Sequence, residues 1–412
     1  MQNVKIKARE LMTFIGSFIP TIESKGDAQA RHVCLAITTK GNQYIMLAKS
    51  YQVGSTTTRF LPLVKKDVQD ETQPYDLQPG EEVVMVQTRR VHQALCGFGA
   101  ATVNFRLLDN GNVELESEEG SKIIVKGQRY VEDGRPVTAT QMVQEMEETE
   151  REMERSAIGV PLVGLSVGLP AAIRMAMMPG NTSDMRGVTL HIATDEHLGS
   201  QSLHIVGAHQ QAMYVHEASL PQLQGAALDV TIMPESGKRM LELVKGCLND
   251  DQDKEGGCKK EVRLSARPDE GVLVVKGDDF VIELKQMDFV PRHCEELMQM
   301  PGKNVVELDR ISLLKAVQGL RKMGETECVV SFHPDSLTVE GEAKEYHGER
   351  AFRLPSHRYG ADEELTQRKL PLLPLCIMLS AASAADSKSV KLLADADSDT
   401  LCLQVGEFNL FV

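Results

Sequence analysis

Tryptophan is absent from this chain of 412 residues, and all aromatic residues together make up only 4% of it. Long apolar runs are missing too, since no stretch of about 18 apolar residues occurs. The first residues, MQNVKIKARELM, lack the apolar segment of a secretory signal. From these absences we expect no transmembrane helix and no export, and therefore a cytoplasmic protein.

Paired cysteines and phosphate-binding loops are also missing. The eight cysteines are scattered without a C-x-x-C pair, which argues against a disulfide or zinc framework. No G-x-x-x-x-G-K-S/T motif occurs, so the sequence predicts no intrinsic ATPase activity. We therefore expect neither a metal nor a cofactor.

What the chain does contain is a repeat. A helix followed by short alternating segments recurs about six times, with helices expected at residues 8–19, 88–96, 170–178, 235–248, 310–323 and 371–385. The alternating segments predict antiparallel strands. Two such units make a domain of ordinary size, so we expect three domains, at 1–140, 156–290 and 301–412. The predicted fold class is α+β, with two helices packed on antiparallel sheets in each domain.

Residues 141–155 (QMVQEMEETEREMER) form a charged stretch between the first two predicted domains. Methionines punctuate this stretch, but no sustained apolar face is visible in it. We interpret it as an acidic linker helix that is solvated on all sides.

Charge is unevenly distributed. A net charge of −14 is opposite to what nucleic-acid binding needs, yet the six expected helices with their flanking residues carry a net +7, which leaves −21 on the rest. On a helical wheel for 310–323, Leu313, Val317 and Leu320 form the apolar face, while Lys315 and Lys322 lie opposite. This segregation favours helices that face a polyanion. Lysine and arginine also suit any exposed helix surface, so charge alone leaves both interpretations open.

One enzyme motif is present. Gly164-Leu165-Ser166-Val167-Gly168 matches the G-x-S-x-G nucleophile elbow of hydrolases, and the sequence predicts a strand before it and a helix after it. Hydrolases of that class need a parallel sheet, whereas the neighbouring strands have the pattern of antiparallel ones. Serine hydrolysis through Ser166 is therefore kept only as an alternative, and we expect no enzyme.

Histidines are dense in one region, at His191, His197, His204, His209 and His216. Their spacings of five to seven residues match neither an H-E-x-x-H helix nor a Cys/His finger. On strands, several of them would face opposite sides of the sheet. We expect histidines on strand surfaces and not metal ligands.

Several segments, taken in order, resemble the bacterial sliding clamp, the β subunit of DNA polymerase III. GVTLHIAT (187–194), SLHIVGAHQQAMYVHEASLP (202–221) and LDVTIMPESGKRMLELVKG (228–246) are similar to the second domain of that family. DDFVIELKQMDFVPRH (278–293) resembles the passage into its third domain. VVELDRISLLKAVQGLRKM (305–323) and LCLQVGEFNLFV (401–412) resemble the start and the end of that domain.

This resemblance implies a processivity factor in DNA replication. Two chains would join head to tail into a ring-shaped homodimer, whose helices line a channel around double-stranded DNA and which tethers the replicative polymerase. Cations on the expected helices would meet phosphates without reading bases. The cations implied are Arg89, Arg174, Lys238, Lys315, Arg321 and Lys322.

The resemblance also implies a pocket for a short hydrophobic peptide of DNA polymerase and clamp-loader subunits. The pocket residues would be Met185, Ala208, Met213, Pro291, Phe408 and Leu410. AHQQAM (208–213) and FNLFV (408–412) depart from the family's usual Thr-Asp-Gly-His-Arg-Leu and Met-Pro-Met-Arg-Leu, which suggests a divergent, phage- or plasmid-encoded member. The alternative function is a clamp-like regulator or decoy that binds replication proteins without encircling DNA.

Overall fold

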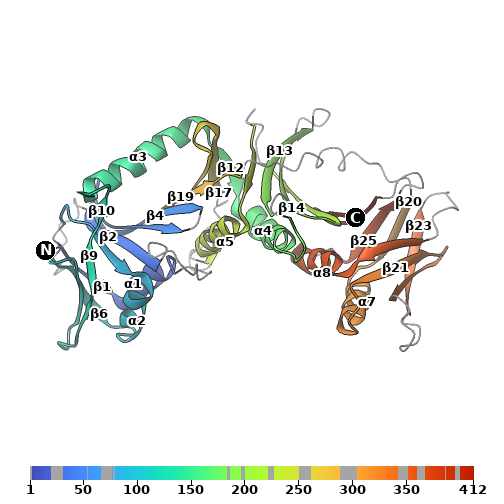
Figure 1. Ribbon diagram of the computed structural model, residues 1–412, viewed down its shortest axis with the longest axis horizontal. Helices are drawn as coiled ribbons and strands as arrows, with labels where there is room; N and C mark the ends of the chain where they lie inside the picture. The colour runs from blue at the N-terminus through green and yellow to red at the C-terminus, as the bar shows by residue number, and fades with distance from the viewer. Residues whose placement is uncertain are drawn as a thin grey trace. The chain divides into compact units, whose positions relative to one another are not determined.

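The computed structural model describes residues 2–19, 31–52, 54–65, 77, 79–182, 186–195, 200–220, 227–249, 261–287, 304–341, 351–359, 367–385, 387–394 and 400–412 (Figure 1). The chain divides into two compact units. The first comprises Met1–Gly159, Glu242–Gly256 and Glu261–Lys285, and the second comprises Val160–Leu241, Gly257–Lys260 and Gln286–Val412. The predicted division into three domains at 140 and 300 stays a prediction.

The helices are α1 (Ala8–Gly16), α2 (Thr88–Cys96), α3 (Ala139–Ser156), α4 (Leu162–Ala176), α5 (Pro234–Asn249), α7 (Arg310–Lys322) and α8 (Leu372–Ala381). Short 3-10 helices follow at Pro268–Glu270 and Ala382–Ala385. Within the described residues, no helix is long and apolar enough to span a membrane.

The first unit contains β1 (Gln2–Lys7), β2 (His32–Lys40), β3 (Gln43–Gln52), β4 (Ser55–Lys65), β5 (Val84–Gln87), β6 (Thr102–Leu107), β7 (Val113–Ser117), β8 (Lys122–Val125), β9 (Gly127–Arg129), β10 (Val131–Glu132), β11 (Arg135–Pro136), β17 (Glu261–Arg267), β18 (Val272–Lys276) and β19 (Phe280–Lys285), and β12 (Ile158–Pro161) lies at its boundary. One sheet has the order β12-β17-β18-β19-β4-β3-β2-β5-β9, and a smaller one has the order β1-β6-β7-β8. Strand β10 pairs only with β11 among the described strands.

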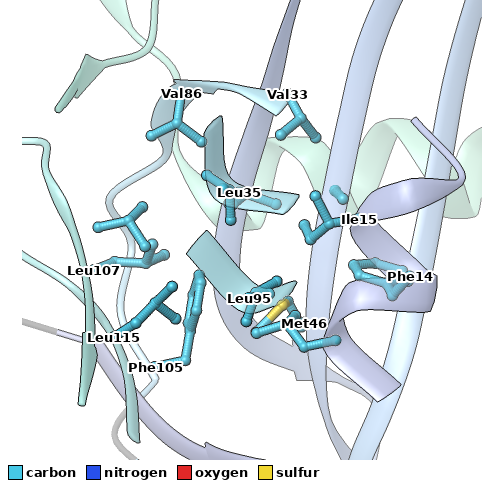
Figure 2. Close-up of a cluster of buried hydrophobic side chains, with 14 of the residues drawn as sticks. Phe14, Ile15, Val33, Leu35, Met46, Val86, Leu95, Phe105, Leu107 and Leu115 are labelled. Carbon is cyan, nitrogen blue, oxygen red and sulfur yellow. The ribbon is translucent and has the colours of Figure 1, made fainter. Parts of the chain in front are cut away.

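Both faces of the larger sheet are buried. Side chains alternate along strand β2, so Val33, Leu35 and Ile37 belong to the cluster beneath α1 and α2, while Cys34 and Ala36 belong to a second cluster that includes α3. Figure 2 shows Leu95 of α2 and Phe14 and Ile15 of α1 meeting Leu35 and Met46 of the sheet. Strand β2 is therefore apolar in both alternating sets, as a strand covered on both sides must be.

Helix α3 corrects the prediction of a solvated acidic linker. Its start is set by a capping box, in which the Thr138 side chain accepts from Gln141 N and the Gln141 side chain accepts from Thr138 N. The side chains of Met142, Val143, Met146 and Met153 are buried against the sheet. The methionines are thus the apolar face that the sequence interpretation missed.

The carboxylates of α3 have partners on the same sheet face. Lys40 Nζ lies 2.9 Å from Glu150, Lys49 Nζ lies 2.7 Å from Glu145, and Arg267 lies 2.5 Å from Glu152. Glu150 also lies 3.4 Å from Lys276 Nζ. The acidity of α3 therefore complements cations on the strands beneath it. Individual exposed pairs of this kind contribute only about 0–1 kcal/mol, so the buried methionines dominate its attachment.

The second unit contains β13 (Val188–Asp195), β14 (Ser200–His209), β15 (Ala212–Ser219), β16 (Asp229–Ile232), β20 (Asn304–Asp309), β21 (Glu327–Phe332), β22 (Ser336–Gly341), β23 (Ala351–Tyr359), β24 (Gln367–Pro371), β25 (Ser389–Ala394), β26 (Leu401–Val405) and β27 (Phe408–Phe411). They form one sheet in the order β16-β13-β14-β15-β27-β26-β25-β20-β23-β22-β21-β24. The pairing of β15 with β27 is antiparallel, with Met213 opposite Phe411 and His216 opposite Phe408.

Helix α4 corrects a second prediction. The sequence predicted a strand around Ser166 and a helix starting at Pro170, but residues 162–176 form one helix with Pro170 inside it. Glycines let this helix approach the sheet closely. A Cβ atom at Gly168 would lie 2.4 Å from His216 Cδ2, and one at Gly207 of β14 would lie 2.3 Å from the Ala172 carbonyl oxygen. Tertiary packing thus overrides the local strand-like pattern.

We predict that Met142→Ala in α3 lowers the free energy of unfolding of the first unit by about 2–5 kcal/mol, because it removes a side chain that is only 1% exposed. The exposed Glu154→Ala on the same helix is the matched control and should change it by less than about 0.5 kcal/mol. Urea denaturation followed by circular dichroism measures both. Equal, small effects would restore the solvated-linker interpretation.

Candidate nucleic-acid interface

Helix α7 has the most regular basic surface in the second unit. The Asp309 carboxylate accepts a hydrogen bond from Ser312 N at 2.7 Å and so caps the helix start. Hydrogen bonding from Ser312, helped by the positive charges of Arg310 and Lys315, lowers the pKa of Asp309. This carboxylate therefore stays ionised at the helix N-terminus, where a negative charge is favourable.

The two faces of α7 are as the sequence predicted. Leu313, Ala316, Val317 and Leu320 are buried. Lys315, Arg321 and Lys322 are exposed, and no carboxylate of the described residues forms an ion pair with them. Their charges are consequently available to an external anion.

Helices α4 and α7 both contact α8, so the three form one layer in the second unit (Figure 1). Helix α8 (LLPLCIMLSA) has no charged residue and is almost wholly buried, which is typical of a helix covered on all sides. Arg174 is exposed in the last turn of α4. The structure therefore places Arg174 and the α7 cations on one helical layer, with an uncharged helix between their two helices.

Helix α2 carries the corresponding cations of the first unit and begins and ends where the sequence predicted. Val91 and Leu95 are buried, while Arg89 and Arg90 are exposed. Arg90 was missing from the predicted set, although the two adjacent arginines were visible in the sequence. Arg9, on the neighbouring helix α1, is exposed as well.

Three other cations on helices have different environments. Lys238 on α5 is only partly exposed, and its neighbour Arg239 is 2% exposed, so Arg239 belongs to the interior. Arg310 donates hydrogen bonds to the carbonyl oxygens of Leu379 and Ser387, at 2.9 Å and 3.0 Å. Arg310 thus satisfies backbone groups at and beyond the end of α8. The net +7 of the helical segments therefore overstates the charge on their outer surface.

The predicted peptide pocket is not assembled as expected. Phe408 and Leu410 are 0% exposed, and they lie opposite His216 and Tyr214, beneath the helices. Met213 lies opposite both Ala208 and Phe411, and because side chains alternate, this group occupies the other face of the sheet. Phe408 and Leu410 therefore have no surface to offer a peptide in this arrangement. Met185 and Pro291 lie outside the described residues.

The face with Met213 carries a small apolar cluster. Val206, Met213, Val215 and Phe411 are buried together, and Cys402 packs against them. Strands from two predicted domains contribute to this cluster. Strands β14 and β15 of the second predicted domain supply three of the residues, and β27 of the third supplies Phe411. Of the four predicted pocket residues that the structure describes, Ala208 and Met213 lie on this face.

Of the four described histidines in this region, His204 and His216 are buried, whereas His191 and His209 are partly exposed. His216 stacks on Phe408 with ring centroids 4.8 Å apart, and burial lowers the pKa of His216 to about 4, against a weak opposing contact with the backbone of Gly164. Burial also lowers the pKa of His204 to about 4, and the nearby His191 adds to this effect. Both rings are neutral near pH 7. His209, with its ring 3.2 Å from the Pro179 carbonyl oxygen, lies near the β14–β15 turn, and His197 lies outside the described residues.

The G-x-S-x-G serine and the possible metal ligands can both be placed in the described part of the chain. Ser166 lies inside α4, where its hydroxyl donates to the Val163 carbonyl oxygen at 2.8 Å, so it is not on a strand-to-helix elbow. In the same residues, no three side chains of His, Cys, Asp or Glu converge on a possible metal position. What this surface offers chemically is a set of fixed positive charges.

Comparisons with known proteins agree with this fold. The sequence matches no protein-family model and no curated protein. Among solved structures, the DNA polymerase sliding clamp of Bacillus subtilis matches with a TM-score of 0.74 at 11% identity, covering 100% of this chain and 98% of that one.

Two further solved structures match over the same extent. The DNA polymerase III beta chain of Streptococcus pneumoniae has a TM-score of 0.73 at 12% identity and covers 100% of this chain and 99% of its own. The beta subunit of Thermotoga maritima has a TM-score of 0.72 at 10% identity, with coverage of 100% and 98%. The predicted α+β class of helices on antiparallel sheets is confirmed, and the chain has the fold of the bacterial sliding clamps.

Proposed function

We propose that this protein is a DNA sliding clamp, a non-enzymatic processivity factor that encircles duplex DNA and tethers a replicative polymerase. The observation that carries the proposal is the match in fold to sliding clamps over 100% of the chain. A fold alone does not define a function, so the surfaces of this chain must also suit the task.

The helical layer suits a phosphate backbone. Lys315, Arg321 and Lys322 project from a rigid helix without competing carboxylates among the described residues, and Arg174 lies on the same layer. Fixed cations attract any sequence equally, because phosphate contacts carry no base information. The proposed binding is therefore weak, nonspecific and compatible with sliding.

Ring closure needs a sheet edge that accepts a second copy. The smaller sheet of the first unit ends in β8, where Ile123 and Ile124 are 37% and 52% exposed. At its other end, the Gln2 side chain donates to the Glu82 carbonyl oxygen and accepts from Ile37 N, which attaches β1 to the larger sheet. An exposed apolar edge strand invites strand pairing, so we assign β8 to a head-to-tail homodimer contact.

Partner proteins would dock on the sheet face with the Met213 cluster, where the partly exposed Ala208 and Cys402 lie beside Met213 and Phe411. A short hydrophobic peptide from a polymerase or clamp-loader subunit suits a small apolar site of this kind. The residues of this proposed site differ from those of the predicted pocket, because the site includes Phe411 and not the buried Phe408 and Leu410.

We predict that Lys315→Glu and Lys322→Glu, singly and combined, reduce retention of the protein on nicked circular DNA. Each lost phosphate contact should also lower the slope of log affinity against log salt by about one. Lys391→Glu, at an exposed position of strand β25 in the same unit, makes the same charge change away from α7 and is the matched control. An equal loss in the control would mean that overall charge, not the α7 surface, governs binding.

We predict that Ile124→Asp converts a dimer into a monomer, because it places an unpaired charge at a contact that would be buried. Val131→Asp is the control, since Val131 is 48% exposed in the first unit but outside the β8 edge. Sedimentation should give twice the 45.4 kDa chain mass for the wild type and the control. A monomeric wild type would contradict the ring and favour a regulator that binds replication proteins off DNA.

We predict that Met213→Lys lowers the affinity for a clamp-binding polymerase peptide at least tenfold while dimerisation is retained. Gln211→Lys introduces the same charge at an exposed turn residue two positions away and should bind normally. Fluorescence anisotropy with a labelled peptide measures both. Unchanged binding by the Met213 variant would remove this face as the docking site.

A further inference from the structure

Three soft donor atoms meet where helix α1 contacts helix α2. The Cys96 thiol donates to Met12 Sδ at 3.5 Å, and Cys96 Sγ lies 3.8 Å from His92 Nδ1. Cys96 is exposed, while Met12 and His92 are partly exposed. Met12 also packs against the core of the first unit, whereas His92 and Cys96 are not among the buried residues of α2.

The backbone fixes the three side chains. His92 and Cys96 are four residues apart on α2, which places them one above the other on one face. Met12 reaches them from α1, and the two helices pack against each other. Gly16 of α1 leaves room for the imidazole, because a Cβ atom there would lie 3.3 Å from His92 Cδ2 and Nε2.

The separations are those of ligands around one metal ion. Metal–thiolate bonds are about 2.3 Å long and metal–imidazole bonds about 2.0 Å. With such bonds, the 3.5 Å sulfur–sulfur distance corresponds to an angle of roughly 100° at the metal, and the 3.8 Å sulfur–nitrogen distance to roughly 125°. Both angles lie near the trigonal and tetrahedral values, so Cys96 can share a metal ion with either partner without a large movement.

The donor set distinguishes between metals. Hard cations prefer oxygen ligands, and structural zinc takes thiolate, imidazole and carboxylate, whereas thiolate and thioether together are soft ligands that suit monovalent copper. No third His, Cys, Asp or Glu side chain joins this cluster among the described residues. The donors are therefore one thiolate, one thioether and one imidazole.

We propose that Met12, His92 and Cys96 form a surface site for Cu(I). On binding, the thiol releases its proton to solvent and the thiolate bonds to the metal, while Met12 Sδ and His92 Nδ1 each supply a lone pair. Copper keeps its oxidation state throughout. The inference does not depend on the proposed function, because it uses only contacts between α1 and α2.

The test is anaerobic titration of the reduced full-length protein with Cu(I), in competition with the chromophoric chelator bicinchoninate. The wild type should bind one more tightly held Cu(I) than Cys96→Ser. Met12→Leu keeps the thiol and the volume but should weaken this site at least tenfold, and His92→Gln should do the same. Cys247→Ser, which removes another partly exposed thiol, is the control and should retain the site.

Two results would overturn the proposal. If Cys96→Ser binds as much Cu(I) as the wild type, the metal is held by other thiols. If Met12→Leu and His92→Gln both bind as tightly as the wild type, Cys96 acts as an isolated thiol and no three-donor site exists. X-ray absorption at the copper edge should show two sulfur neighbours and one nitrogen neighbour in the wild type, and loss of one sulfur in Met12→Leu.

Discussion

Burial of one helix face against an antiparallel sheet is the constraint on which the other features of this molecule depend. Once Leu313, Val317 and Leu320 of α7 are committed to the core, the helical period of 3.6 residues fixes Lys315 and Lys322 on the outer side. Basic residues at these outer positions can therefore be present without any change in how the helix packs on the sheet. The uncharged α8 obeys the same constraint, because a helix enclosed by α4, α7 and the sheet has no outer side to charge.

The local sequence pattern was sufficient to predict a helix and its bounds where the helix has a clear start signal and one apolar stripe. Helices α2 and α7 were predicted within one residue of their observed bounds, and Asp309 caps α7 as such a residue should. Only the C-terminal part of helix α4 was predicted, because Gly164 and Gly168 weaken any helical signal before Pro170. Glycine is required at these two positions because His216 and Ala218 of β15, which are distant in the sequence, pack so close to the helix that they leave no room for a Cβ atom.

Distance along the chain also explains the misinterpretation of α3 and of the pocket. The glutamates of α3 appeared to be solvated because their partners, such as Lys40 and Arg267, are more than 100 residues away. For the pocket, strand alternation was readable, but the register between β15 and β27 was not. A shift of one residue exchanges the two faces of a strand, so the face on which Phe408 and Leu410 lie could not be read from the sequence.

The pairing of β15 with β27 has a consequence for how this protein folds. Residues 213–216 must find residues 408–411, with most of the second unit between them in the sequence. Ordering so distant a contact has a high entropic cost before the contact stabilises anything, so this junction should close late. Until then β15 has an unpaired edge, and strand β27 of a neighbouring chain can pair with it as well as β27 of its own chain does. Strand exchange between copies is thus the characteristic misfolding hazard of this architecture.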